Sequence, residues 1–439
     1  MDGVFGYSVP SLSPLLFAIY IADMAEDIAL ADFGFNIGGL VISGLLLADD
    51  LVLLSRTAAG LKSLIMMVKI HADSLKMQIS ESKSEVISPA AEEWNLLNDQ
   101  GDVTLSLQAV VKYKYLGVVM YNSMHKTGLE KQEQALTTAR RYKGACLKMS
   151  RMGPDTVMLA STCWSTVAIP SILFGCNIIP FTETKIEEIE RLQSQLAKSL
   201  LGLSIGSPNF SAQESLGWKT FRHHLFLNVL TFYFRLLHLP EERWSQKALV
   251  DHLEGKWTSP YLRYIHRIRS EVMMLELPAS TALISAHLDD YFLTKVNSQI
   301  SDSKLPALNL LTCLKQRPFI LEVRESMEVS RYRYFSASLG NHAPRLGFPR
   351  RKFCVLCPGQ TLVSEMHLMR CPYLMDIQSS TGISSFINLC LFKGLKYVDC
   401  FSFYVNGLDV SGVYIGDADF KARGRALMML TETYMSRWK

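Results

Sequence analysis

The sequence predicts an α+β protein in which a mixed helix-and-strand segment is followed by a long helical region and a small metal-binding segment. Residues 35–55 are rich in Val, Ile and Leu and are interrupted by glycines, as short strands are. From about Gly128 the apolar residues recur at helical spacing instead. Residues 354–371 then gather cysteines and a histidine. At 439 residues, the chain is long enough for two or three domains.

The composition indicates a large core and no strong electrostatic preference. Hydrophobic residues make up 49% of the sequence and the net charge is only +4, so a nucleic-acid partner has to be argued from local basic clusters. The nine cysteines follow no evenly paired framework, which favours a reducing compartment.

One uncharged run, residues 157–181, is long enough to cross a bilayer. It contains Pro170, Gly175 and Asn177, and no second span accompanies it. We therefore predict a buried helix that breaks at 168–170 and a second short element. We expect a soluble protein inside the cell that does not associate with membranes. A nuclear location and the oligomeric state are left open.

The expected elements follow from periodicity and from turn and cap residues. In chain order they are a helix over 15–28, strands within 35–55, a helix over 58–77, strands over 85–88 and 113–120, a helix that starts at the capping box 184–187 and stops at Gly202, further helices over 210–330, and, after the metal-binding segment, a short strand region and a final helix.

The stretch GLLLADDLVLLS (44–55) places Asp49 and Asp50 side by side between two apolar runs. Adjacent carboxylates repel each other and are costly to bury unless a cation compensates them. In nucleotidyl transfer, carboxylates at a strand turn hold the Mg²⁺ ions that activate the attacking hydroxyl. A plain exposed turn is the alternative, and the dipeptide alone favours it.

The ordered neighbours of the aspartates favour the metal-binding interpretation. They are SLSPLLFAIYIADM (11–24), GLKSLIMMVKIHADSLKMQISESKSEVIS (60–88) and KYKYLGVVM (112–120). Together they resemble the reverse transcriptase palm of non-LTR (LINE-type) retrotransposons. The resemblance implies template and nucleotide support by Ser13, Pro14 and Phe17, catalytic Mg²⁺ ligation by Asp49 and Asp50, assistance to the departing pyrophosphate by Lys83, and primer grip by Tyr115, Leu116 and Gly117.

The resemblance also implies parts that this sequence does not contain. The family's palm needs a further aspartate on an earlier strand, which would precede Met1, and the Gln-Gly step before Leu12-Ser13-Pro14 is absent. We therefore expect Mg²⁺ binding only if an upstream aspartate completes the site. The resemblance without that aspartate implies a truncated RNA-directed DNA polymerase that is inactive by itself. Whether the chain is a piece of a longer active enzyme is left open.

The stretch CVLCPGQTLVSEMHLMRC (354–371) has the spacing Cys-x2-Cys-x9-His-x3-Cys. Three thiolates and one imidazole form the closed tetrahedral set that a structural Zn²⁺ prefers, so we predict Cys354, Cys357, His367 and Cys371 as ligands. Free thiols are the alternative. The basic lead-in Arg350, Arg351 and Lys352 suits contact with phosphate, so RNA or DNA is the expected partner. The same family carries a C-terminal knuckle of this kind.

A second basic cluster, ARRYKGACLKMSR (139–151), places Arg140 and Arg141 on a predicted helix. Binding to the template and primer and a merely solvated surface both explain it. The expected domains are a partial palm (1–122), a helical thumb (123–240), a helical extension (241–340), a CCHC zinc knuckle with its basic lead-in (341–375), and a C-terminal strand and helix segment (376–439).

The sequence therefore predicts a retrotransposon-derived reverse transcriptase domain protein. The alternatives are a non-enzymatic protein that binds nucleic acid through its knuckle and basic thumb, and a relic without function.

Overall fold

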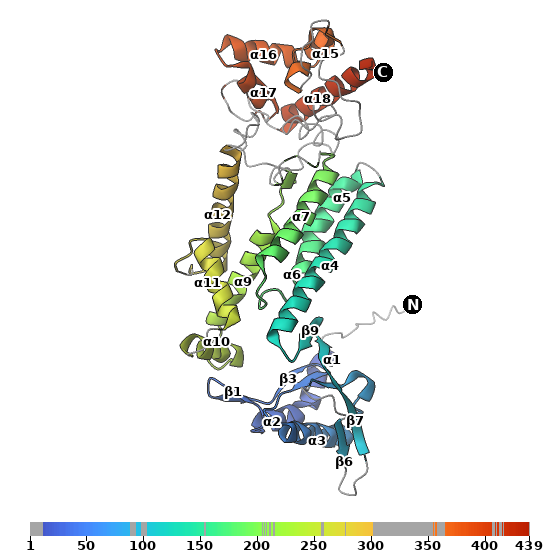
Figure 1. The fold of residues 1–439 in the computed structure, drawn as a ribbon, viewed down its shortest axis with the longest axis vertical. Helices are drawn as coiled ribbons and strands as arrows, with labels where there is room; N and C mark the ends of the chain where they lie inside the picture. Colours follow the sequence, from blue (N-terminus) through green and yellow to red (C-terminus); the bar gives the residue numbers. More distant parts are fainter. Residues whose placement is uncertain are drawn as a thin grey trace, which may run out of the picture. The chain divides into compact units, whose positions relative to one another are not determined.

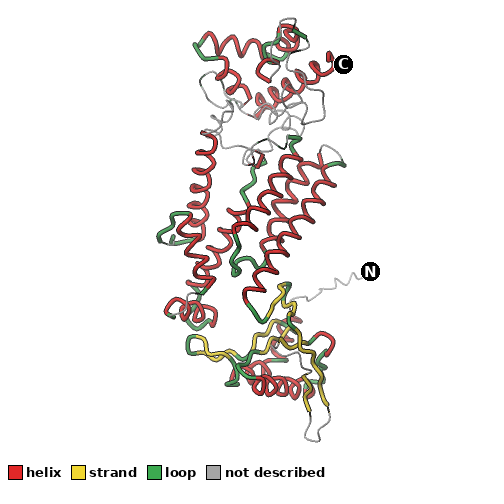
Figure 2. Tube along the Cα trace, viewed as in Figure 1, coloured by secondary structure: helices red, strands yellow, loops and turns green. Residues whose placement is uncertain are grey.

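The computed structural model is a mixed α+β protein with small sheets and long helices (Figures 1 and 2). Two compact units make up the chain: Met1–Glu130 with Phe232–His266, and Lys131–Thr231 with Arg267–Lys439. The structure describes residues 12–87, 94–97, 103–152, 155–203, 205, 207, 209, 212–213, 216–255, 259–276, 278–301, 354, 356–357, 365–405, 409, 411, 415 and 417–438.

The first unit combines short strands with helices. Its elements are α1 (Leu12–Tyr20), α2 (Ala22–Leu30), β1 (Phe35–Ile37), β2 (Leu40–Ile42), β3 (Gly44–Leu47), β4 (Asp50–Leu53), α3 (Ala58–Ser74), the 3₁₀ turn η1 (Glu81–Lys83), β5 (Glu85–Ile87), β6 (Trp94–Leu97), β7 (Val103–Val110), β8 (Lys112–Tyr115), β9 (Val118–Tyr121) and α10 (Trp244–Glu254). The strands form three antiparallel hairpins, β1–β2, β3–β4 and β8–β9, and one three-stranded sheet in the order β5–β7–β6. The predicted strands are confirmed, whereas the single helix expected over 15–28 is two helices that meet at Ile21.

Helix α3 organises the first unit because two of its sides are buried. Ile65 packs against the sheet residues Val86, Trp94, Leu96, Leu105 and Leu107. Val68 packs against Ile21, Met24 and Ile28 of the α1–α2 segment. The helix begins where Thr57 Oγ1 accepts a hydrogen bond of 3.1 Å from the amide of Gly60, which satisfies one of its free N–H groups. The sheet and the α1–α2 segment are therefore held by one helix.

The second unit is helical throughout its described residues. Its elements are α4 (Met124–Ser150, which begins in the first unit), α5 (Asp155–Cys163), the π-helical turn η2 (Trp164–Ala168), α6 (Ile169–Leu173), α7 (Glu183–Leu200), α9 (Phe221–Leu237, which ends in the first unit), α11 (Pro260–Glu271, which begins there), α12 (Thr281–Ser301), α14 (Glu365–Leu368), the 3₁₀ turn η5 (Pro372–Leu374), α15 (Met375–Ser380), α16 (Ile383–Phe392), α17 (Tyr397–Val405) and α18 (Asp417–Trp438). Helices α4, α5 and α7 lie side by side (Figure 1). Trp164 is fully buried there and stacks on Trp218, with ring centroids 6.0 Å apart.

Two expectations for the helical region are wrong in detail. The break predicted at 168–170 is absent, because the wider π turn η2 accommodates Pro170, whose ring would clash with the preceding turn of a regular α-helix. Helix α7 begins at Glu183 after Thr182, ahead of the predicted capping box. The Thr182 hydroxyl instead donates to Gln132 Oε1 at 3.0 Å.

No strand occurs among the described residues of 376–439, where every regular element is a helix. The stretch YVDCFSFYV is rich in aromatic and β-branched residues, which favour strands by propensity. Its buried residues Phe401, Tyr404 and Val405 nevertheless lie three and four positions apart, which is the spacing of one helix face. Packing of these residues against the buried cluster around Leu427 therefore favours helix α17 over a strand.

A histidine in the second unit makes its stability depend on pH. His223 is buried on α9, its ring packs on Phe292 with centroids 5.0 Å apart, and Nε2 lies 3.2 Å from Asp289 Oδ1 without the alignment of a hydrogen bond. Burial, with the nearby Lys219, lowers the pKa of His223 to about 4, although Asp289 opposes this shift.

We expect the second unit to lose stability as the pH falls from neutrality towards 4. The unfolded histidine has a pKa of about 6.5, so as the pH falls it takes up a proton before the folded one does. The stabilisation that comes from the neutral, buried imidazole is therefore fully present only above about pH 6.5. The loss at pH 5 should be on the order of 1–2 kcal/mol for His223. Urea unfolding followed by circular dichroism at pH 7 and pH 5 measures it. His223→Gln should reduce the dependence; a pH slope equal to that of the wild type would contradict the assignment.

Candidate functional site

The structure gathers Cys354, Cys357, His367 and Cys371 at one point. Their ligand atoms all lie within 4.8 Å of one another, with Cys357 Sγ 3.4 Å from His367 Nε2 and 3.5 Å from Cys371 Sγ. Sulfur atoms bound at about 2.3 Å to one tetrahedral ion stand about 3.8 Å apart, close to the observed spacing. This set of three sulfurs and one imidazole could hold a metal ion.

Local structure explains how these four positions meet. His367 lies on the short helix α14, and the chain turns directly after it, with the amide of Arg370 donating to the carbonyl of His367 at 3.0 Å. Gln378 on α15 is buried and donates to the carbonyls of Leu368 and Cys371 at 2.8 and 3.0 Å. These bonds fix the backbone between the last two ligands.

The electrostatics of the cluster favour neutral groups in the absence of a cation. Burial, together with hydrogen bonds to Cys371 and Cys354, raises the pKa of Cys357 to about 12. Burial also raises the pKa of Cys371 and lowers that of His367. A divalent ion reverses the preference of a thiol, because it stabilises the thiolate directly. Metal binding at this site would therefore release protons.

The cluster is part of a larger core. Cys354 and Cys371 are buried with Leu368, Phe401 and Leu427. We define the C-terminal module as residues 365–438 together with Cys354 and Cys357; its core contains described residues from both segments that the sequence predicted as separate domains. The basic lead-in Arg350, Arg351 and Lys352 lies outside the described residues.

A half-buried arginine joins the helices of the C-terminal module. The guanidinium of Arg423 on α18 lies 4.3 Å from the ring centroid of Phe386 and 4.8 Å from that of Tyr404. It also donates to the carbonyls of Phe403 and Tyr404 at 3.3 Å each. Sequence reasoning missed Arg423 and Gln378, because neither forms part of a motif.

In the first unit, the predicted catalytic aspartates lie on an exposed hairpin. Leu47 and Asp50 pair across the β3–β4 turn, with Ala48 at a φ of 54° in the left-handed region. Asp49 and Asp50 are both exposed, so the turn needs no cation for its own stability. Among the described residues, the Cys–His cluster is the one group of three or more potential metal ligands, and no third carboxylate joins this pair.

The motif residues Ser13, Pro14 and Phe17 all lie on α1. Phe17 packs against the apolar cluster of Ile21, Met24 and Ile28, which also contacts Leu46 and Leu51 of the aspartate hairpin. Phe17 of the predicted support motif and the aspartate hairpin therefore pack against the same apolar cluster.

The other residues predicted for the palm also have contacts with one another. Lys83 ends the turn η1, and its carbonyl accepts a hydrogen bond of 3.1 Å from the hydroxyl of Tyr113 on β8. Tyr115 precedes the β8–β9 turn, where Leu116 and Gly117 have φ values of 46° and 81°. Burial raises the pKa of Tyr115, and the carboxylate of Asp50 raises it further. The aspartate hairpin and the predicted primer grip are therefore electrostatic neighbours.

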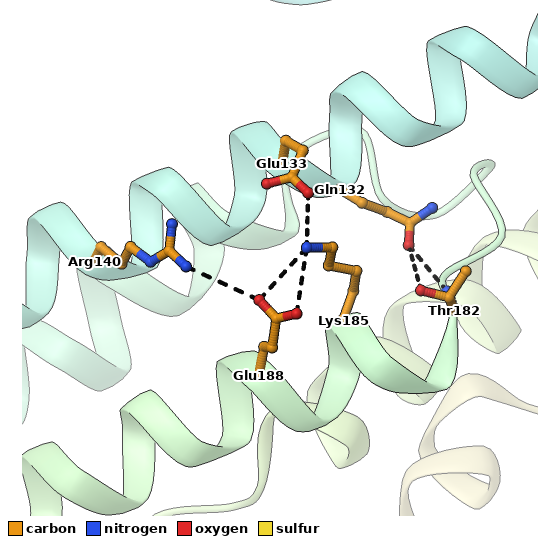
Figure 3. Close-up of polar contacts among 6 residues, drawn as sticks. All are labelled: Gln132, Glu133, Arg140, Thr182, Lys185 and Glu188. Atoms are coloured by element: carbon orange, nitrogen blue, oxygen red, sulfur yellow. Dashed lines mark hydrogen bonds and ion pairs between the residues drawn. The ribbon is translucent and has the colours of Figure 1, made fainter.

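The predicted basic residues Arg140 and Arg141 lie on the exposed side of α4. Arg140 is 3.9 Å from a carboxylate oxygen of Glu188 on α7, and Lys185 contacts both Glu133, at 2.7 Å, and Glu188, at 3.3 Å (Figure 3). The hydrogen bond with Glu133 raises the pKa of Lys185. Arg140 thus has an acidic neighbour within the protein, whereas the guanidinium of Arg141 lies 5.3 Å from the ring of Tyr142.

Comparison with known proteins identifies no relative: no protein-family model matches the chain, and no curated protein matches it significantly. In the described part of the chain, no helix is both long and apolar enough to span a bilayer.

We expect Cys357→Ser to abolish stoichiometric zinc binding, because it removes one of the four clustered ligands. The measurement is elemental analysis of the purified full chain, with about one zinc per chain expected for the wild type. Cys163→Ser is the matched control, since Cys163 is also a partly exposed thiol but lies outside the cluster. Equal zinc content in both variants would contradict the assignment.

We also expect Asp50→Asn to lower the pKa of Tyr115 part of the way towards its ordinary value. The substitution removes the carboxylate's contribution and leaves the larger effect of burial. Titration of ¹³C-labelled tyrosine by NMR measures the shift, with Tyr115→Phe to assign the signal. Asp49→Asn is the control and should change little; equal effects of both substitutions would show that Asp50 is not the neighbour of Tyr115.

Proposed function

We propose that this chain is a nucleic-acid-binding protein derived from a retrotransposon-type reverse transcriptase, with a C-terminal module that folds around a structural zinc ion. The observation that carries the proposal is the convergence of Cys354, Cys357, His367 and Cys371 inside the core of that module. A four-ligand site of this composition leaves no open position for substrate, so the ion has a structural role. Zinc supplies folding free energy and no reaction step.

The surface of the module offers groups for single-stranded nucleic acid. The guanidinium of Arg370 lies 4.6 Å from the ring centroid of Tyr397, and the α16–α17 turn just before Tyr397 carries the exposed Lys393 and Lys396. Next to this turn the side chain of Phe392 is 87% exposed. Bases stack on exposed aromatic rings, and lysines and arginines neutralise phosphates. This set of exposed side chains is the proposed binding face of the module.

A second candidate function is polymerisation as part of a complete palm. The specific observation in its favour is that Asp50, Tyr115 and the Lys83–Tyr113 hydrogen bond lie in one region of the first unit. In such a site, the carboxylates of Asp49 and Asp50 would hold Mg²⁺ while Tyr115, Leu116 and Gly117 position the primer. Two-metal transfer needs further ligands, so we expect no primer extension from the chain alone.

We expect the double variant Lys393→Gln/Lys396→Gln to weaken binding of single-stranded RNA or DNA by roughly tenfold at 0.1 M salt, since two phosphate contacts are lost. The salt dependence should also become shallower, by about 1.4 in the slope of log K against log salt. Fluorescence anisotropy with a labelled 20-nucleotide strand measures both quantities.

Lys76→Gln is the control, since Lys76 is an exposed lysine of the first unit. Unchanged affinity in the double variant would reject the proposed face. Absence of binding by the zinc-loaded wild type would reject the binding function and favour a relic.

A further inference from the structure

A groove in the first unit is lined by none of the predicted site residues. It has a volume of about 760 Å³ and is open to solvent. Its lining comes from three elements: Asp27 on α2; Lys62, Ser63, Met66, Met67, Ile70 and His71 on α3; and Asn95 and Leu96 on β6. One wall is thus a helix and another is a strand.

The strand wall has an edge that can accept a partner. β6 stands at the end of the β5–β7–β6 sheet and pairs with β7 alone among the described strands. An edge strand directs alternate backbone N–H and C=O groups away from its sheet. Natural edges are often protected by charged residues or proline, and Trp94–Leu97 contains neither. The strand at the other edge, β5, carries the exposed Glu85.

The helix wall is apolar in its middle and polar at its ends. Ile70 is 62% exposed, and the half-buried Met66 and Met67 lie beside it. Unbranched methionines adapt to irregular apolar partners. Lys62 and His71 are nine positions apart on the helix, which is about 13 Å and equals roughly four residues of extended chain. The groove therefore matches a short strand.

The charges of the groove are unequal at its two ends. His71 Nε2 lies 2.7 Å from Asp27 Oδ2, so that end is already paired. At the other end, the ammonium of Lys62 lies 5.7 Å from the ring centroid of Trp94, and no carboxylate of the described residues forms an ion pair with it. A complementary ligand thus carries an acidic group next to Lys62.

We propose that this groove binds an extended peptide segment of another polypeptide, which adds to β6 as a further strand and places an acidic side chain against Lys62. Backbone hydrogen bonds to β6 give affinity, and the methionines together with Ile70 receive alternate side chains. The proposal is independent of nucleic-acid binding by the C-terminal module.

The test uses the full chain and two fluorescein-labelled peptides, Thr-Val-Thr-Val-Thr-Glu and the same sequence ending in Lys. We expect anisotropy to show preferential binding of the Glu peptide. Hydrogen exchange should slow about tenfold at the backbone amides of 94–97 in the complex. Lys62→Glu should reverse the preference between the peptides. Ile70→Glu should abolish binding, whereas Leu30→Glu, at a residue that is 76% exposed on α2 and outside the groove, should not.

Three outcomes would overturn the proposal. They are no binding of either peptide, binding without slower exchange at 94–97, and a preference that Lys62→Glu leaves unchanged. Slower exchange at 94–97 that depends on protein concentration without peptide would assign the edge to a second copy of the chain instead. The Lys62→Glu result decides the matter even if Ile70→Glu fails to fold.

Discussion

The C-terminal module brings three sulfur atoms and one imidazole to a single point, and this convergence constrains the short helices around it. Its ligand-bearing helix α14 has 4 residues and the adjoining α15 has 6, and helices of that length are unstable on their own. Gln378 and the buried core around Leu368 hold the ligand turn in place. A structural zinc ion contributes on the order of 10 kcal/mol to a fold of this kind, which is comparable to the stability of a whole domain.

The first unit is held together in a different way, because helix α3 packs against the sheet on one side and against the α1–α2 segment on another. That arrangement explains why the aspartate hairpin can be exposed at its turn and fixed at its base. Gly44 lies at that base, where a Cβ atom would stand only 2.7 Å from Cγ2 of Ile28. The glycine therefore allows strand β3 to approach α2 closely, and it sets the position of Asp49 and Asp50 relative to the rest of the unit.

The sequence predicts those features whose residues lie close together along the chain. The spacing of Cys354, Cys357, His367 and Cys371 predicts the clustered ligands, and the apolar runs around Asp49 predict the β3–β4 hairpin. The π turn before Pro170 and helix α17 could not be predicted in the same way, because packing with distant segments overrides propensity there. The proximity of Asp50 to Tyr115 depends on how two hairpins fold together, so the motifs alone indicate only their order along the chain.

Hydrogen exchange of the full chain, with zinc bound and after chelation, tests the central claim that the metal organises the C-terminal module. We expect removal of zinc to accelerate exchange throughout α14–α18 to near the unfolded rate, while α4 and α7 keep their protection. Undiminished protection of α16–α18 after complete zinc removal would contradict the claim, since the core would then hold without its metal.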